Sequence, residues 1–436
     1  MIANLKKVWT TDHIRQKIIF TVLMIAVYKL LSAIPVPGIN VALLSAFTEQ
    51  LRANTQLAFF GSIMGGGLEQ FSIILMGLAP YINATIIIQL LAVIVPSLDA
   101  LKKEGEQGQK KLNNYTRYLT VPLALAQSYG MILLLNTIVG TGGAAPIIDT
   151  TNFWGVVFPA MAYITAGTMI LLWLGDLITE RGIGNGSSII IFAGVLAGVP
   201  QHILNYVTTD NYGLLLFISI LTVGVIYIIV RFTEGYRKVP LIYTRTGRDE
   251  RSYFPIRVNQ AGMVPIIFAI AIITFPSLIG QILAKRGGTG ATVGEWLSTN
   301  LSMQNPSWFY ISAYFLLVLG FAFFYVSITF NTTDVAENIQ KRGGYIPGVR
   351  PGKETATYLQ QVSDRLNLWG GGFLALIAVF PYVITKVNAY FNLFPTSSQI
   401  DFLISGSGLI IVVGVILDII RRIDTDMKSF DYKKFH

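Results

Sequence analysis

The sequence predicts an all-α membrane protein with ten transmembrane helices. Of its 436 residues, 53% are hydrophobic and only 13% are charged, whereas an ordinary soluble domain is about 25% charged. The apolar residues gather into repeated runs of about 20, the length that crosses the hydrocarbon core of a bilayer as a helix. Few turn-forming stretches interrupt these runs, which favours helices over a β-barrel.

The ten predicted spans follow one another along the whole chain. The first comes directly after a basic stretch, as in a signal peptide, but its apolar run is too long for one. We therefore expect it to remain as an uncleaved span. The spans lie at residues 17–36, 72–96, 117–139, 153–176, 188–206, 214–233, 261–284, 309–330, 369–386 and 402–420.

Lysine and arginine set the predicted orientation. With a cytoplasmic N-terminus, 27 of the 32 basic residues fall on the cytoplasmic side of the membrane and four fall on the other side; Lys29 lies inside the first span. Such an excess marks the cytoplasmic loops of membrane proteins. Both termini are therefore expected in the cytoplasm. The net charge of +9 then follows from topology and does not by itself indicate nucleic-acid binding.

The groups that catalysis needs are missing from the predicted spans. The chain has no cysteine, which excludes disulfides and thiolate metal sites, and His13, His202 and His436 lie outside the spans or at an edge. No pair of carboxylates lies near a predicted membrane midplane. The segment Gly348–Glu354 resembles a P-loop but ends in glutamate where that motif needs serine or threonine. The sequence indicates that the chain is not an enzyme, and it predicts no metal or cofactor.

A polytopic secondary transporter for a small solute is the alternative function. Ion-coupled carriers place ionisable residues within the membrane, where they mark the ion path. Here Lys29 is the only charge well inside a predicted span, and its long side chain can extend to the interface. An apolar path suits a cargo of changing sequence better than one fixed ion.

A short internal repeat links the second and seventh spans. Gly77–Ile82 and Gly262–Ile267 both read G-x-x-P-x-I, with an offset of 185 residues. The two spans hold equivalent places in two halves of five spans each, so equivalent spans run in opposite directions, as in an inverted repeat. The proline in each motif predicts a local break in the helix.

Five longer segments carry a resemblance to a known family. The chain resembles the SecY family, the channel subunits of the bacterial protein-export translocase, in family order and over nearly its whole length. The segments are Phe71–Leu91, Leu101–Thr120, Gly167–Gly194, Arg257–Ala269 and Gly343–Thr355.

The resemblance implies a channel that passes unfolded secretory polypeptides across the bacterial plasma membrane. The resemblance further implies that this channel releases transmembrane segments sideways into lipid, through a gate between spans 2/3 and 7/8. The ten helices are expected to form two inverted five-helix halves around a central pore. Residues 1–206 would form the first half, with a short re-entrant plug helix at about 57–71. Residues 207–436 would form the second, with long cytoplasmic loops at 234–260 and 331–367.

The resemblance also assigns the plug and the pore ring. In the plug, glycines allow close packing and easy displacement; the alternative is a plain re-entrant linker. The expected plug residues are Phe59, Phe60, Ile63, Met64, Gly65, Gly66 and Gly67. A narrow apolar ring excludes water and ions without a charged gate. The ring residues are Leu78, Ile82, Ser187, Ile191, Ile267 and Ile411.

Spacing agrees with the ring assignment, because 78/82 and 187/191 each share one helix face. Without the resemblance, such isoleucines would be expected to face lipid or another helix. Ser187 departs from the aliphatic pattern of the family. The expected lateral-gate residues are Asn83, Gln127, Asn259 and Phe275. The alternative role for the three polar residues is ordinary hydrogen bonding between packed helices.

The two long loops are expected to bind the partners that drive transport. The resemblance implies docking of the motor ATPase SecA and of the translating ribosome, and a heterotrimer with SecE and SecG. Signal sequences, nascent membrane proteins and the lipid bilayer complete the expected partners. Arginine-rich protrusions suit acidic protein grooves and ribosomal RNA phosphate, although the charges could serve only topology. The expected docking residues are Arg237, Lys238, Arg245, Arg248, Arg251, Arg350 and Lys353.

Overall fold

A computed structural model describes most of the chain. The predicted plug residues, Phe59 to Gly67, lie outside the described residues. The described residues are 9, 11–37, 39, 71–140, 148–208, 212–245, 248–284, 289–301, 306–391 and 406–434.

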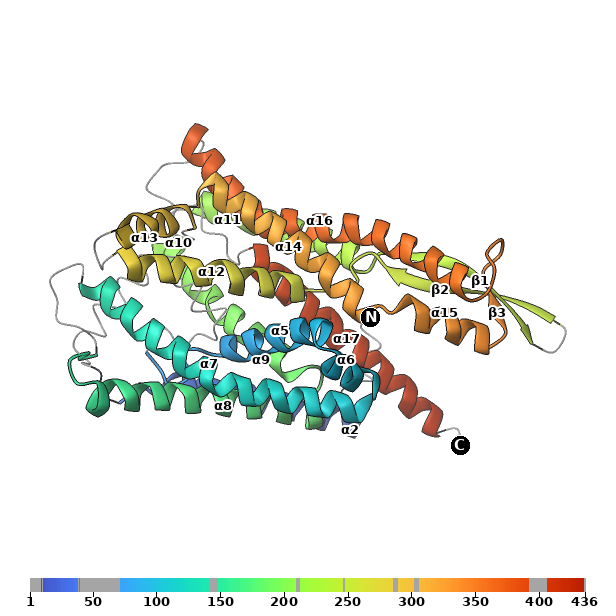
Figure 1. Ribbon diagram of the computed structural model, residues 1–436, viewed down its shortest axis with the longest axis horizontal. Helices are drawn as coiled ribbons and strands as arrows, with labels where there is room; N and C mark the ends of the chain where they lie inside the picture. Colours follow the sequence, from blue (N-terminus) through green and yellow to red (C-terminus); the bar gives the residue numbers. More distant parts are fainter. Residues whose placement is uncertain are drawn as a thin grey trace. The chain divides into compact units, whose positions relative to one another are not determined.

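The described chain is mostly helical (Figure 1). Its first helices are α2 (Asp12–Ser32), α5 (Ala79–Ile94), α6 (Pro96–Lys103) and α7 (Glu106–Gly140), followed by the π-helix η1 (Phe153–Val157) and α8 (Phe158–Arg181). Next come α9 (Gly186–Ala197), α10 (Val199–Thr208), α11 (Tyr212–Thr233), α12 (Val264–Ala284) and α13 (Thr289–Asn300). The last are α14 (Trp308–Thr329), α15 (Thr332–Lys341), α16 (Lys353–Phe391) and α17 (Gly406–Lys434).

Each of the ten predicted spans overlaps a helix in the described part of the chain. By length and apolar composition, four of the described helical segments can cross a membrane: Phe153–Arg181, Leu215–Thr233, Trp308–Lys341 and Lys353–Asn388. The pair α5 and α6, bent by 106°, would be a fifth if it counts as one span. The helical prediction is confirmed, and the number of ten spans stays a prediction.

A three-stranded antiparallel sheet departs from the predicted all-α fold. Its strands β1 (Tyr236–Arg245), β2 (Arg248–Arg257) and β3 (Gly344–Tyr345) have the order β2-β1-β3. They lie in the two segments expected to be loops. Alternate residues of the hairpin, Val239 and Leu241 among them, are buried with side chains of α15 and α16. This shared core explains why the segments are folded.

The chain divides into two compact units. One contains Met1–Ile218, Thr274–Ser307 and Asp401–His436, and the other contains Ser219–Ile273 and Trp308–Ile400. The two halves expected from the internal repeat, residues 1–206 and 207–436, are a different division of the chain and stay a prediction.

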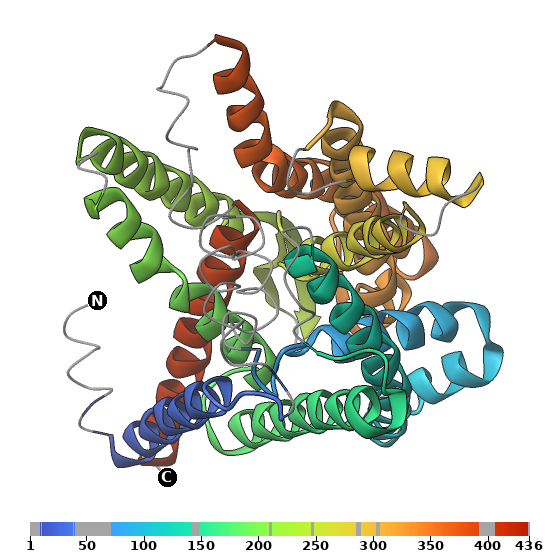
Figure 2. The ribbon, with the colours of Figure 1, turned by 90° about the vertical axis from the view of Figure 1, so that its left-hand side faces the viewer.

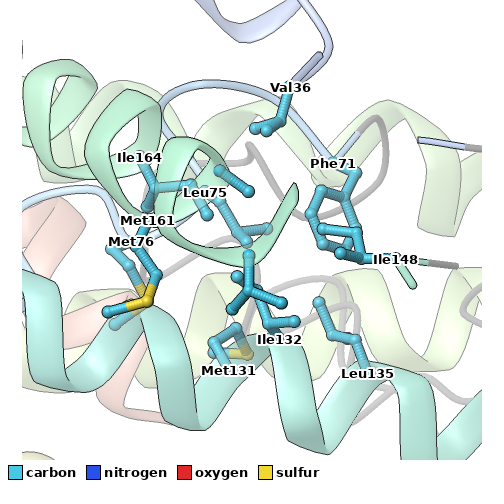
Figure 3. Packing of buried hydrophobic residues seen from close by; sticks show 12 residues of the cluster. Val36, Phe71, Leu75, Met76, Met131, Ile132, Leu135, Ile148, Met161 and Ile164 are labelled. Atoms are coloured by element: carbon cyan, nitrogen blue, oxygen red, sulfur yellow. The ribbon is translucent and has the colours of Figure 1, made fainter. Parts of the chain in front are cut away.

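In the first unit, an apolar cluster joins the segment before α5 to α7 and α8. Met131, Ile132 and Leu135 of α7 lie close to Phe71 and Leu75 (Figure 3). The whole buried cluster is Val36, Phe71, Leu75, Met76, Met131, Ile132, Leu135, Ile148, Val157, Ala160, Met161 and Ile164. Because this core fixes residues 71–78, it also fixes the position at which α5 begins.

A close backbone contact at Gly167 holds α8 against the same segment. A β-carbon at Gly167 would overlap the carbonyl oxygen of Ile73. We therefore expect Gly167→Ala to destabilise the protein by about 1–3 kcal/mol, the usual cost of overpacking. Gly224→Ala in α11 is the matched control, because a β-carbon there meets nothing within 4 Å and alanine favours the helix. Thermal unfolding in detergent should show a lower midpoint for Gly167→Ala only; equal midpoints would contradict the contact.

The same unit joins the two ends of the described chain. Near its N-terminal end α2 lies beside the C-terminal half of α17 (Figure 2), where Ile14 and Ile18 pack with Ile423. Lys17 Nζ donates a hydrogen bond of 2.7 Å to Asp426. These contacts hold α17 well past the end of its predicted span.

Candidate channel and docking sites

The two copies of the internal repeat fold alike at the start of their helices. Gly77 (φ 51°) and Gly262 (φ 64°) both adopt the left-handed conformation that favours glycine. Pro80 and Pro265 are each the second residue of the following helix, α5 and α12. The prediction of a break inside each helix is therefore wrong. Each helix begins at the motif, where the missing N–H of proline has no intrahelical partner to lose.

The predicted ring residues of the first unit occupy three helices. Leu78 is the N-cap of α5, and its carbonyl accepts the N–H of Ile82 at 3.0 Å, one turn further on. Ile191 in α9 and Ile411 in α17 are buried, and these two helices pack together. Ile267 lies near the start of α12, in the second unit. Aliphatic side chains thus occupy all the predicted positions except 187.

Ser187 lies at the contact between α8 and α9. A β-carbon built on Gly175 would be 3.4 Å from Ser187 Oγ. The start of α9 is held tightly there, because Gly186 N donates to Thr179 Oγ1 at 2.8 Å and Asn185 caps the helix. The serine hydroxyl therefore lies close to Gly175 of α8, and the side chain is half-buried.

Three of the predicted gate residues lie on helices, and Asn259 lies in the connection between β2 and α12. Asn83 in α5 and Gln127 in α7 are half-buried on two helices that pack together. Gln127 Oε1 is buried, and within the described ranges it has no hydrogen-bond partner. Asn259 is buried, and its Oδ1 accepts the N–H of Gly262 at 2.9 Å. Phe275 lies in α12. Among the polar residues predicted for the gate, Asn259 is thus occupied by a local contact, whereas Gln127 keeps a buried acceptor available.

The β1–β2 hairpin presents an exposed cationic and aromatic face. Lys238 Nζ lies 4.9 Å from the ring centroid of Tyr253 and 5.7 Å from that of Tyr236. All three side chains are exposed. Arg237 is exposed on the other face. The strand ends furthest from α11 and α12 contain Arg245, Arg248 and Arg251. Arg245 and Arg248 are opposite each other in the register of the two strands.

Backbone geometry presents Arg350 to solvent. Gly348 (φ 82°) and Gly352 (φ 96°) are left-handed on either side of it, and Val349 packs into the core beneath the sheet. The Arg350 carbonyl accepts the Thr355 hydroxyl at 2.9 Å, which fixes the backbone. The Arg350 side chain is 88% exposed and has one weak contact, 4.0 Å to Glu354 of the adjoining α16. Lys353, the first residue of α16, is exposed beside it.

The structure brings the two predicted docking loops together. Strand β3, which precedes the Arg350 turn, pairs with β1 through Ile242 and Tyr345. Both segments share the core that includes Val239, Ile346 and Leu359. The sequence does contain a signal for this arrangement, since Thr246-Gly247 separates two runs with alternating apolar residues, a pattern typical of a β-hairpin. We give the name docking platform to the β1–β2 hairpin together with the segment Gly348–Lys353, which contains Arg350.

Comparison with known proteins gives the family of this chain. The SecY family profile matches residues 72–420. The protein translocase subunit SecY of Escherichia coli (strain K12) is 37% identical over 433 residues, which cover 97% of this chain and 93% of the relative. That of Streptomyces galbus is 35% identical, and the match covers 100% of both chains.

Solved structures agree in fold. A structure of a SecY protein concerned with its plug domain matches with a TM-score of 0.65 at 19% identity, over 96% of this chain and 94% of that one. Sec61 in a canine ribosome–channel complex matches with a TM-score of 0.61 at 16% identity, over the same shares. At such identities these structures establish only the fold, a protein-conducting channel fold. Together with the full-length sequence matches, they show that the chain belongs to the SecY family.

Proposed function

We propose that the chain is the channel subunit of a protein translocase. The observation that carries this proposal is the 37% identity, over nearly the full length, to a relative that is a protein translocase subunit. The docking platform supports it, because a folded basic protrusion suits a partner that must be held during transport. The chain itself is a passive channel, and ATP hydrolysis belongs to the motor SecA.

The proposed channel has ten spans in two inverted halves, residues 1–206 and 207–436. The matched glycine and proline geometry at the starts of α5 and α12 supports the repeat. The membrane is the bacterial plasma membrane, with both termini in the cytoplasm, as the distribution of basic residues indicates.

The proposed constriction is the aliphatic ring, which the plug covers from outside when the channel is idle. Aliphatic side chains exclude water from a narrow pore and can close around a peptide of any sequence. Segments that are apolar enough leave sideways between spans 2/3 and 7/8. The buried acceptor of Gln127 suits a gate that forms and breaks polar contacts worth about 0.6–2 kcal/mol each.

The docking platform is proposed to receive SecA and the translating ribosome in turn. Exposed positive charge comes from Arg350 on the turn, Lys353 at the start of α16 and Lys238 on the hairpin. Such groups match the carboxylates of an acidic protein surface or the phosphates of RNA. SecE and SecG are the proposed companion subunits, and signal sequences and nascent membrane proteins are the cargo.

Reconstitution tests the proposal. The purified chain is placed in lipid vesicles with SecE and SecG, and SecA, ATP and an unfolded preprotein are added outside. The expected result is full-length preprotein that protease cannot reach unless detergent is added. Vesicles that lack only this chain are the control. Complete digestion of the preprotein in both samples would contradict the proposed function.

The serine of the ring gives a smaller prediction. Ser187→Ile should lower the resting ion leak of the reconstituted channel, because it removes a hydroxyl that offers water a partner. Single-channel recordings without cargo measure this, with Ser187→Ala as the size control. If Ser187→Ile lowers thermal stability and leaves the leak unchanged, the side chain serves only the contact with Gly175.

A further inference from the structure

The connection between the hairpin and α12 is fixed residue by residue. Six residues, Val258 to Met263, separate the end of β2 from the start of α12. Val258 N donates to the carbonyl of Gly235 at 2.9 Å, which closes the base of the hairpin. Asn259 Oδ1 accepts the N–H of Gly262 at 2.9 Å. These bonds give the connection a defined backbone geometry.

The same connection is fastened to α16. Ser363 Oγ donates a hydrogen bond of 3.0 Å to Gln260 Oε1, and Ser363 is fully buried. Seven residues further along α16, Gly370 lies directly against Val258, so that a β-carbon there would overlap the Val258 carbonyl oxygen. Two points on one helix therefore contact two residues of the connection, Val258 and Gln260.

Stability alone does not explain this choice of residues. Asn259, Ser363 and Asn367 are all buried, and burying polar groups costs free energy unless each one is satisfied. The Nε2 atom of Gln260 is buried, yet it has no hydrogen-bond partner in the described part of the chain. Apolar residues of similar size would fill the space at lower cost. What the polar contacts add is a defined geometry between strand and helix.

The far side of the connection leads directly to α12. Ala261 packs with Ala322 and Val326 of α14, and α12 begins three residues later. Ile267, the predicted ring residue, is only seven residues beyond Gln260. At the other end, Phe232 of α11 stacks on Phe373 of α16 with ring centroids 3.8 Å apart.

We propose that Asn259, Gln260, Ser363 and Gly370 form a rigid joint, here named the hairpin joint. It makes the hairpin, α16 and the first turn of α12 move as one body. Force from a partner on the docking platform then reaches Ile267 without loss in a loose linker. This inference rests on the proposed function of the platform and of α12. The four residues are positioning residues, because they act through Ile267 and not on the cargo.

A distance measurement tests the joint by itself. The chain has no cysteine, so spin labels can be attached at Ser252→Cys on β2 and Leu368→Cys on α16, both exposed. The unmodified joint should give a narrow distance distribution by pulsed electron resonance. Ser363→Ala and Gln260→Met should each broaden it, and together should broaden it no more than either alone, because both remove the same bond. Gly370→Ala should shift it.

Ser327→Ala is the matched control, since Ser327 is exposed on α14 and its hydroxyl donates to the carbonyl of Phe324 in its own helix. It should leave the distribution unchanged. If Ser363→Ala and Gly370→Ala also leave it unchanged, the hairpin is held by other contacts and the joint is wrong.

A transport measurement tests whether the hairpin joint passes force from the docking platform to Ile267. With purified SecA, Ser363→Ala should bind with unchanged affinity but support preprotein transport several-fold more slowly. If Ser363→Ala broadens the distance distribution and transport stays normal, the joint does not pass force from the docking platform to Ile267. The unmodified chain is measured in the same assay. If it shows no SecA-dependent transport, the proposed function fails, while the distance measurement still decides the joint.

Discussion

Asparagine in place of Ile82 should make the idle channel conduct ions at several times the resting rate. The amide offers water two donors and an acceptor within a constriction that depends on excluding water. Ile82 follows Leu78 by one turn at the start of α5, so its position is fixed by the first helical turn. Ile267→Asn, at the equivalent place after Pro265, should have the same effect. Conductance of reconstituted channels without cargo is the measurement.

Two controls separate the ring from general damage to the helix. Ile82→Val keeps an aliphatic side chain and should leave the resting conductance low. Ile94→Asn places the same amide at the exposed far end of α5, where Ile94 is 74% exposed, and should not open the channel. Equal resting conductance in Ile82→Asn, Ile267→Asn and the unmodified channel would remove both residues from the constriction.

Glutamate in place of Arg350 should reduce SecA-driven transport at least about tenfold while the protein still folds and inserts. Coupling between close charge pairs across an interface is about 1.5–7 kcal/mol, and about 1.4 kcal/mol corresponds to tenfold in affinity. The side chain is almost fully exposed, so its replacement costs the folded chain little. Its backbone is fixed by Thr355 and the flanking glycines, so the reversed charge would meet the partner at the same place.

Arg422→Glu is the control for net charge, because Arg422 is exposed on the C-terminal half of α17 and lies outside the docking platform. Arg350→Lys keeps the charge and should retain part of the activity, since lysine lacks the planar fork of arginine. Transport rates at saturating and limiting SecA are the measurement. A normally expressed Arg350→Glu protein with normal rates would show that the turn is not a docking site.

The helices could be predicted from the sequence because the solvent of a membrane protein is apolar. A run such as Leu215–Thr233 is a helix wherever it meets lipid, since its backbone groups must bond within the segment. The bend between α5 and α6 at Pro96 was not predicted. Hydropathy reads composition and does not register a change of direction within an apolar stretch.

The sheet was missed for a different reason. Basic residues such as Arg237 and Lys238 are frequent in the segment and indicate a cytoplasmic loop between two spans. The apolar residues that fold it, Val239 and Leu241, find their partners about a hundred residues later, at Ile339 and Ile346. Contacts at that separation leave only the weak local signal of alternation.

The site shows the same division. Arg350 is singled out in the sequence because a whole motif carries it, and the structure shows that its two flanking glycines are left-handed; its role in docking stays a prediction. Ser363 and Gly370 could not be singled out. A serine and a glycine inside a long helix are ordinary, and only the position of Val258 and Gln260 against them gives them a role.

Depletion of this protein from growing cells tests the central claim most directly. A protein-conducting channel predicts that preproteins with signal sequences of many kinds accumulate uncleaved in the cytoplasm as the protein disappears, before growth stops. Resupply of the unmodified chain should clear them. Normal cleavage and export of preproteins, together with failure to take up one small solute, would contradict the account and support a secondary transporter instead.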